Sequence, residues 1–244
     1  PQTTNKWQNS EIEGIDIMLA IDVSTSMLAE DLKPNRLEAA KDVAAEFING
    51  RPNDNIGITL FAGETFTQCP LTVDHAVLLD MIHNIKCGLI TDGTAVGMGI
   101  ANAVTRLKDS KAKSKVIILL TDGTNNKGDI SPMTAAEIAK SFGIRVYTIG
   151  VGTNGMAPYP YPVGNTVQYV SMPVEIDEKT LTEIAGTTDG NYFRATSNSK
   201  LKEVYEEIDK LEKTKLNVKE YSKRDEEYHW FALAAFLCVL LEVL

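Results

Sequence analysis

The stretch Asp16–Asp22, DIMLAID, runs directly into the motif DVSTS at residues 22–26, and together they decide the fold. The residues between the two aspartates are all apolar, as in a parallel strand that is covered on both faces. Leu37, Val43 and Phe47 then follow at the spacing of one helix face. A buried strand that leads into an amphipathic helix is the first half of a βα unit, so we expect an α/β protein.

The same alternation continues along the chain. Further apolar runs predict strands at residues 55–62, 65–71, 116–121, 145–150 and 191–194. Helical spacing predicts helices at residues 77–85, 96–107, 134–142, 178–185 and 201–211. Because only Gly63 and Glu64 separate the first two runs, these should form a hairpin with its second strand at a sheet edge. We therefore expect a doubly wound, Rossmann-like sheet of six mostly parallel strands with one antiparallel edge strand.

Residues 153–174 interrupt this pattern with four prolines and three tyrosines. Prolines and glycines at this density predict an irregular excursion from the scaffold, with a small hairpin at residues 166–171. Exposed tyrosines are typical of interfaces, so Tyr159, Tyr161 and Tyr169 are a candidate partner surface. An excursion without a binding role fits the same residues equally well.

The two ends of the chain differ in character. Residues 1–13 are a polar lead-in, residues 14–213 the folded domain, and residues 214–229 a charged linker. Residues 230–241 are all apolar, and a membrane-spanning helix needs about 20 such residues, so residues 230–244 are interpreted as the start of a truncated transmembrane helix. A buried C-terminal core helix is the alternative.

Composition excludes several classes of function. The net charge of −9 argues against a nucleic-acid partner, which needs clustered Lys and Arg. Cys69, Cys87 and Cys238 are too few for a disulfide framework or a zinc site. Cys69 and Cys87 flank one predicted helix, and both a disulfide between them and two free thiols are compatible with the sequence. The sequence contains neither a Walker loop nor a nucleophile-elbow motif. We expect a protein partner and no small-molecule substrate.

Polar residues gather where two predicted strands end. Asp22, Ser24 and Ser26 follow the first strand, and Asp122 follows the run 116–121. In a doubly wound sheet, ligands bind beyond the carboxyl ends of the strands, where the strand order reverses. Two converging carboxylates favour a bound cation, and the loop residue Thr94 can add a hydroxyl. Ordinary turn residues and, for Thr94, a helix N-cap are the alternatives.

These motifs, DxSxS, a loop threonine and a strand-end TDG, resemble the metal-ion-dependent adhesion site of von Willebrand factor A (VWA) domains. The resemblance covers residues 14 to about 211. It implies that Ser24, Ser26 and Thr94 supply hydroxyl oxygens to a metal, with Asp22 and Asp122 acting directly or through water. Such hard ligands suit Mg²⁺, with Mn²⁺ and Ca²⁺ as substitutes. Neutral hydroxyls leave the cation under-neutralised, so a partner protein's Asp or Glu carboxylate is the expected guest.

A finer resemblance is to the bacterial membrane-anchored Bat aerotolerance proteins, and to BatA-like members in particular. It rests on residues 27–41, 61–72, 92–107 and 190–195. The resemblance implies the bacterial inner membrane, a periplasmic VWA domain and a membrane complex with other Bat-type proteins. Thr25 departs from the Gly or Asn that is frequent in relatives, but it is not a ligand position.

Two other functions remain open from the sequence. A strand-end aspartate with Mg²⁺ also suits a phosphoryl-transfer enzyme that uses Asp22 as nucleophile. That chemistry normally needs a second carboxylate two residues later, where Ser24 stands. The third hypothesis is a structural adaptor in which the metal only ties loops together. We expect a binding module rather than an enzyme.

Overall fold

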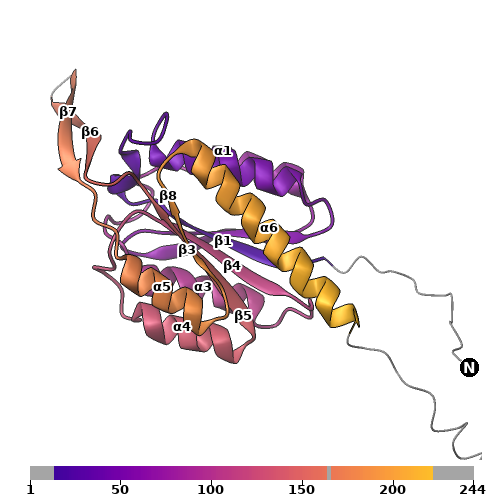
Figure 1. The fold of residues 1–244 in the computed structure, drawn as a ribbon. Coiled ribbons are helices and arrows are strands. Elements are labelled where there is room, and N and C mark those ends of the chain that lie inside the picture. The colour runs from indigo at the N-terminus through magenta and orange to yellow at the C-terminus, as the bar shows by residue number, and fades with distance from the viewer. Residues whose placement is uncertain (1–13, 164–165, 222–244) are drawn as a thin grey trace, which may run out of the picture.

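The computed structural model describes residues 14–163 and 166–221, which form a layered α/β domain (Figure 1). Its main sheet has the strand order β3-β2-β1-β4-β5-β8. All neighbouring strands are parallel except β2 and β3, which are antiparallel, so the predicted six-stranded sheet is confirmed. The strands are β1 (Asp16–Asp22), β2 (Asn55–Phe61), β3 (Thr65–Thr72), β4 (Lys115–Thr121), β5 (Ile144–Val151) and β8 (Tyr192–Ala195).

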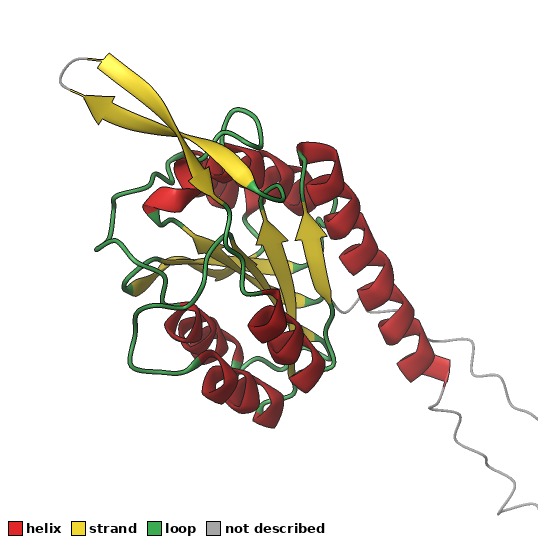
Figure 2. Ribbon diagram, turned by 60° about the vertical axis from the view of Figure 1, so that its left-hand side comes forward, coloured by secondary structure: helices red, strands yellow, loops and turns green. Residues whose placement is uncertain are grey.

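Helices cover both faces of this sheet (Figures 1 and 2). One face packs against α1 (Arg36–Asn49), α2 (His75–His83) and α6 (Asn198–Tyr221). The other packs against α3 (Val96–Leu107), α4 (Pro132–Ser141) and α5 (Glu178–Thr187). The short 3₁₀ helix η1 (Thr25–Leu28) follows β1 directly. The sheet is therefore buried on both sides, as its nearly continuous apolar strands require.

Strand β1 divides its side chains between the two cores. Ile17, Leu19 and Ile21 join the core on the α1 side, whereas Met18 and Ala20 join the core on the α3 side. All of them are at most 1% exposed. Burial of an aliphatic side chain of this size contributes about 1.5–3 kcal/mol, so β1 anchors the loop that follows it.

The strand order reverses beside β1. The chain passes from β1 through α1 to β2 on one side, and β4 lies on the other side. Ile21 is paired with Leu120, so the two strands end at the same level and Asp22 lies beside Thr121. The sheet therefore brings residues 22–26 and 121–123 to one crevice, as the sequence predicts.

Residues 153–174 are more regular than expected. They contain β6 (Met156–Val163) and β7 (Thr166–Pro173), which form a separate antiparallel two-stranded sheet (Figure 2). Residues 166–171 all lie in the single strand β7, so the prediction of a small hairpin within them is wrong, as is the prediction of irregular backbone at residues 156–163. Prolines at alternate positions leave every second N–H free for pairing, and a strand with one unpaired edge tolerates that.

Two sequence interpretations concern the ends and the cysteines. Helix α6 continues to Tyr221, into the segment predicted as a linker, while residues 1–13 and the apolar residues 230–244 lie outside the described part. Within the described residues, no helix combines the length and apolarity needed to cross a bilayer. Cys69 and Cys87 are free thiols, and Cys238 lies outside the described residues.

Candidate metal centre

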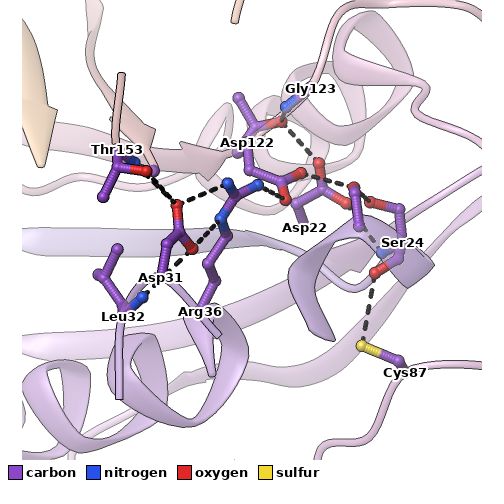
Figure 3. A network of polar contacts seen from close by, with 12 residues as sticks. Asp22, Ser24, Asp31, Leu32, Arg36, Cys87, Asp122, Gly123 and Thr153 are labelled. Carbon is purple, nitrogen blue, oxygen red and sulfur yellow. Dashed lines mark hydrogen bonds and ion pairs between the residues drawn. The ribbon is translucent and has the colours of Figure 1, made fainter. Parts of the chain in front are cut away.

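Asp22 lies at the bottom of the crevice and is completely buried. Its Oδ1 accepts a hydrogen bond from the Ser24 amide at 2.9 Å, and its Oδ2 accepts one from the Thr121 hydroxyl at 2.6 Å. The first bond turns the chain sharply after β1, and the second joins the ends of β1 and β4. Asp22 is therefore fixed in position by both strands (Figure 3).

Ser24 and Ser26 place their hydroxyls side by side above Asp22. Their Oγ atoms are 3.0 Å apart, and Ser26 Oγ donates to Asp122 Oδ1 at 2.7 Å. Ser24 is the N-cap of the 3₁₀ helix η1 and has extended backbone, and Ser26 lies in the first turn of that helix. A chain of polar contacts thus joins the first motif to the second.

Asp122 is held on its other side by a buried arginine that the sequence analysis did not identify. Arg36 Nη1 donates to Asp122 Oδ2 at 2.6 Å, and the Arg36 side chain is only 4% exposed. The same guanidinium makes a two-pronged contact with Asp31, with both distances at 2.7 Å. Asp31 also accepts from the Thr153 amide, so the network reaches the end of β5 (Figure 3).

Thr94, in the loop before α3, lies beside Gly123 of the TDG motif. A Cβ atom added to Gly123 would lie 3.2 Å from Thr94 Oγ1, so the hydroxyl packs directly against the TDG backbone. Residue 94 follows Gly93, whose φ of +128° is accessible mainly to glycine. The helix N-cap is Ala95, without a side-chain capping bond, so the interpretation of Thr94 as the cap is wrong.

Asp92 is a second residue that the sequence analysis missed. It accepts hydrogen bonds from the Thr25 amide at 3.0 Å and from the Thr25 hydroxyl at 2.8 Å. These contacts tie the loop that carries Thr94 to the loop that carries Ser24 and Ser26. Asp92 lies within the DGT sequence that includes Thr94, but its partner 67 residues away cannot be read from sequence.

The carboxylates of the crevice are electrostatically strained. Burial, together with the charge of Asp122, raises the pKa of Asp22 to about 7. Burial likewise raises the pKa of Asp122, although Arg36 opposes the shift. The three carboxylates of Asp22, Asp31 and Asp122 carry more negative charge than the single guanidinium of Arg36 neutralises. A bound cation would compensate this excess negative charge.

The donor set fits a hard divalent cation. Two oxygens at adjacent positions of an octahedral ion, each about 2.1 Å from it, lie about 3.0 Å apart. The Ser24 and Ser26 Oγ atoms have that separation. Carboxylate and hydroxyl oxygens are also the ligand types that Mg²⁺, Mn²⁺ and Ca²⁺ prefer. No group of three or more His, Cys, Asp or Glu side chains suited to a metal occurs among the described residues, so a site here depends on hydroxyls.

Comparison with known proteins identifies the architecture. The sequence profile of the von Willebrand factor type A domain matches residues 16–207. The chain belongs to the VWA family. A structure of the protein BatB from Bacteroides thetaiotaomicron superposes with a TM-score of 0.72 and 34% identity, over 82% of this VWA chain and all of that one. An aerotolerance-related membrane protein from Bacteroides fragilis gives a TM-score of 0.71 and 32% identity, with 81% and 98% coverage.

Other relatives are longer than the segment that this chain matches. An uncharacterized protein of Borreliella burgdorferi is 29% identical over 99% of this VWA chain and 71% of its own length. A UPF0353 protein of Mycolicibacterium paratuberculosis is 32% identical over 78% of the chain, which spans 58% of that relative. A mussel byssus matrix protein, with a TM-score of 0.64, 25% identity and coverage of 81% and 45%, has a MIDAS motif occupied by zinc.

Proposed function

We propose that this VWA domain is a metal-dependent protein-binding module. Ser24, Ser26 and Thr94 supply hydroxyl oxygens to Mg²⁺, with Mn²⁺ or Ca²⁺ as substitutes. Asp122 acts directly or through water, and Asp22, whose two oxygens already accept hydrogen bonds, acts through water. The metal supplies an electrophilic position for an Asp or Glu carboxylate of a partner protein. The observation that carries the proposal is the contact chain from Ser24 through Ser26 to Asp122, in a crevice with surplus negative charge.

The residues around the donors orient them. Thr121 and the Ser24 amide occupy both oxygens of Asp22, and Arg36 fixes one oxygen of Asp122. The neutral hydroxyls of Ser24 and Ser26 can then contact the cation without cancelling its charge. A cation left with residual positive charge binds an anionic oxygen of a partner more strongly than a neutral one.

The surroundings of Asp22 favour binding over phosphoryl transfer. A nucleophilic carboxylate needs an oxygen that faces the substrate, whereas Asp22 is 0% exposed and both of its oxygens accept hydrogen bonds. Ser24 also occupies the place where the acid/base carboxylate would stand. An activity on phosphate esters that is lost in Asp22→Asn would support the enzyme hypothesis instead.

Membrane attachment completes the proposal. Two structural relatives from Bacteroides are a membrane protein related to aerotolerance and BatB. In line with the resemblance to the Bat proteins, we further propose that this VWA domain lies on the periplasmic side of a bacterial inner membrane, is anchored through residues 230–244 and assembles with other Bat-type proteins. The proposed anchor follows the charged residues 214–229, of which those up to Tyr221 belong to α6.

Immobilised peptides test the binding function directly. Beads carrying Asp-containing peptides and matched Asn-containing peptides are offered the chain in Mg²⁺ and then in EDTA. We expect preferential capture by Asp, release by EDTA and weak capture of Ser26→Ala. Ser131→Ala, which removes a side-chain capping bond at the start of α4 and none of the proposed donors, is the matched control. Equal capture in EDTA would refute the proposal, and a metal that raises only the melting temperature would be structural.

A further inference from the structure

The hairpin β6–β7 has two edges with different hydrogen-bonding chemistry. In β6, Pro158, Pro160 and Pro162 recur at every second position and have no N–H. The other residues of β6, such as Tyr159 and Tyr161, therefore make the bonds to β7. The prolines define the outer edge, where the Pro158 carbonyl accepts from the Glu30 amide at 2.8 Å. A strand edge without N–H groups cannot pair with a further strand.

The pairing register of β6 and β7 also leaves backbone hydrogen-bonding groups unpaired on the outer edge of β7. Ser171, Tyr169 and Val167 lie opposite Pro158, Pro160 and Pro162. Since proline cannot form the pair that exchanges two hydrogen bonds, these three residues direct N–H and C=O away from β6. No backbone bond from the described residues outside the hairpin reaches them. Because the outward residues recur every second position, these donors match the repeat of an incoming extended strand.

The side chains of the hairpin itself match a neutral, apolar segment, and the one carboxylate among the described residues that contacts this edge, Glu30, accepts a hydrogen bond from the Tyr169 hydroxyl at 3.0 Å. Residues 155–174 contain no Asp, Glu, Lys or Arg. Val167 is 58% exposed and Tyr169 61%, with Val170 and Met172 each at 47%. Lysine and other charges normally protect an exposed strand edge from pairing, and β7 has none. Figure 1 shows the hairpin projecting from the domain beyond the main sheet.

The hairpin and the metal centre border the same cavity. A cavity of about 250 Å³ lies between them. On one side it is lined by Ser26 and Arg36, and on the other by Tyr159, Tyr161 and Met172. A partner whose carboxylate reaches the metal centre would therefore contact the cavity-lining face of the hairpin, which includes Met172 of β7.

We propose that the outer edge of β7 binds an extended, apolar segment of the same partner protein as an added antiparallel or parallel strand. This inference rests on the proposed function for the identity of the partner, while the pairing itself depends only on the hairpin. The main-chain bonds give affinity, and the exposed apolar side chains select alternating apolar residues near the partner's acidic residue.

Ser171→Pro tests the edge with little other change. It removes one outward N–H, its position already has extended backbone, and it lies opposite Pro158. Ser171→Ala is the matched control because it keeps the N–H. The probes are linear peptides selected from a random displayed library on the intact chain in Mg²⁺. We expect acidic peptides with alternating apolar residues, about tenfold weaker binding to Ser171→Pro, and unchanged binding to Ser171→Ala.

Amide hydrogen exchange supplies a second measurement. In the free chain, the Tyr169 amide should exchange faster than the paired Val170 amide, and bound peptide should protect it. Persistent cross-strand contacts between Tyr159 and Val170 in Ser171→Pro establish that the hairpin is intact, and Val167→Pro is the alternative variant. Metal-dependent binding of acidic peptides that ignores both proline variants would overturn the strand docking and leave the proposed function standing.

Two other outcomes separate the hypotheses further. Peptide binding that falls in Ser171→Pro but persists in EDTA would support the docking edge and refute the metal-dependent function. Concentration-dependent self-association that Ser171→Pro abolishes would overturn the assignment to a partner, because a second copy of the chain would then be the added strand.

Discussion

Arg36 joins Asp31 to Asp122: its guanidinium makes two bonds to the first carboxylate and one, at 2.6 Å, to the second. Arg36 and Asp31 frame the start of α1, whereas Asp122 follows β4. The position of α1 is therefore coupled to Asp122 by a buried ion pair. Loss of one partner from such a pair leaves the other charges buried without compensation.

Substitution of Arg36 should destabilise the domain strongly. Arg36→Met leaves Asp31 and Asp122 unpaired, and we expect the free energy of unfolding to fall by about 3–5 kcal/mol in metal-free buffer. Urea denaturation measures the change. Saturating Mg²⁺ should restore part of the loss, because the cation replaces some of the missing positive charge. Lys202→Ala, which removes an exposed ion pair with Glu46, should have little effect.

The glycine of the TDG motif should control metal affinity rather than stability. In Gly123→Ala the new methyl group lies 3.2 Å from Thr94 Oγ1 and must displace that hydroxyl. We expect a loss of metal affinity of about tenfold or more, measured by calorimetry, since displaced supporting contacts have effects of that size. Gly186→Ala, where nothing lies within 4 Å of the added Cβ, should leave affinity unchanged. Equal affinities in the two variants would contradict this role of Thr94.

The Asp92 contact should hold the Thr94 loop in place. Asp92→Ala removes both hydrogen bonds to Thr25, so amides at residues 88–93 should exchange faster with solvent. Metal affinity should fall although Asp92 is not proposed as a ligand. Asp109→Ala, in the loop after α3, provides a control with the same loss of charge. Unchanged exchange in Asp92→Ala would show that other contacts fix the loop.

Acid should destabilise the packing of α6 around Glu212. Burial alone would raise the pKa of Glu212, but hydrogen bonds from Arg145, Tyr147 and Ser114 lower it below the usual value. A carboxyl whose folded pKa is depressed contributes stability above its unfolded pKa, about 4.3, and loses it as pH falls through the folded value. The wild type should therefore lose more free energy of unfolding than Glu212→Gln as the pH falls from 5 to below the folded pKa of Glu212. Urea denaturation at each pH measures this loss. Parallel pH profiles would contradict this assignment.

Much of this domain is predictable because its strands are unambiguous. Five consecutive apolar residues in β1 and the run before Thr121 predict buried parallel strands, and the rule for strand ends then brings Asp22 and Asp122 together. Arg36 was missed because a charged residue at a helix start normally faces solvent, and only packing brings it to Asp122. The β6 strand was missed because its prolines predict a loop, whereas their regular spacing leaves the inner edge free to pair.

The central claim is that oxygens from three distant segments share one cation. A crystal of the chain soaked in Mn²⁺, with data collected at the manganese absorption edge, tests it most directly. We predict a single anomalous peak about 2.1 Å from the Ser24 and Ser26 hydroxyl oxygens and close to Thr94, Asp22 and Asp122. An empty crevice at saturating Mn²⁺, with the Ser26 bond to Asp122 unchanged, would contradict the account.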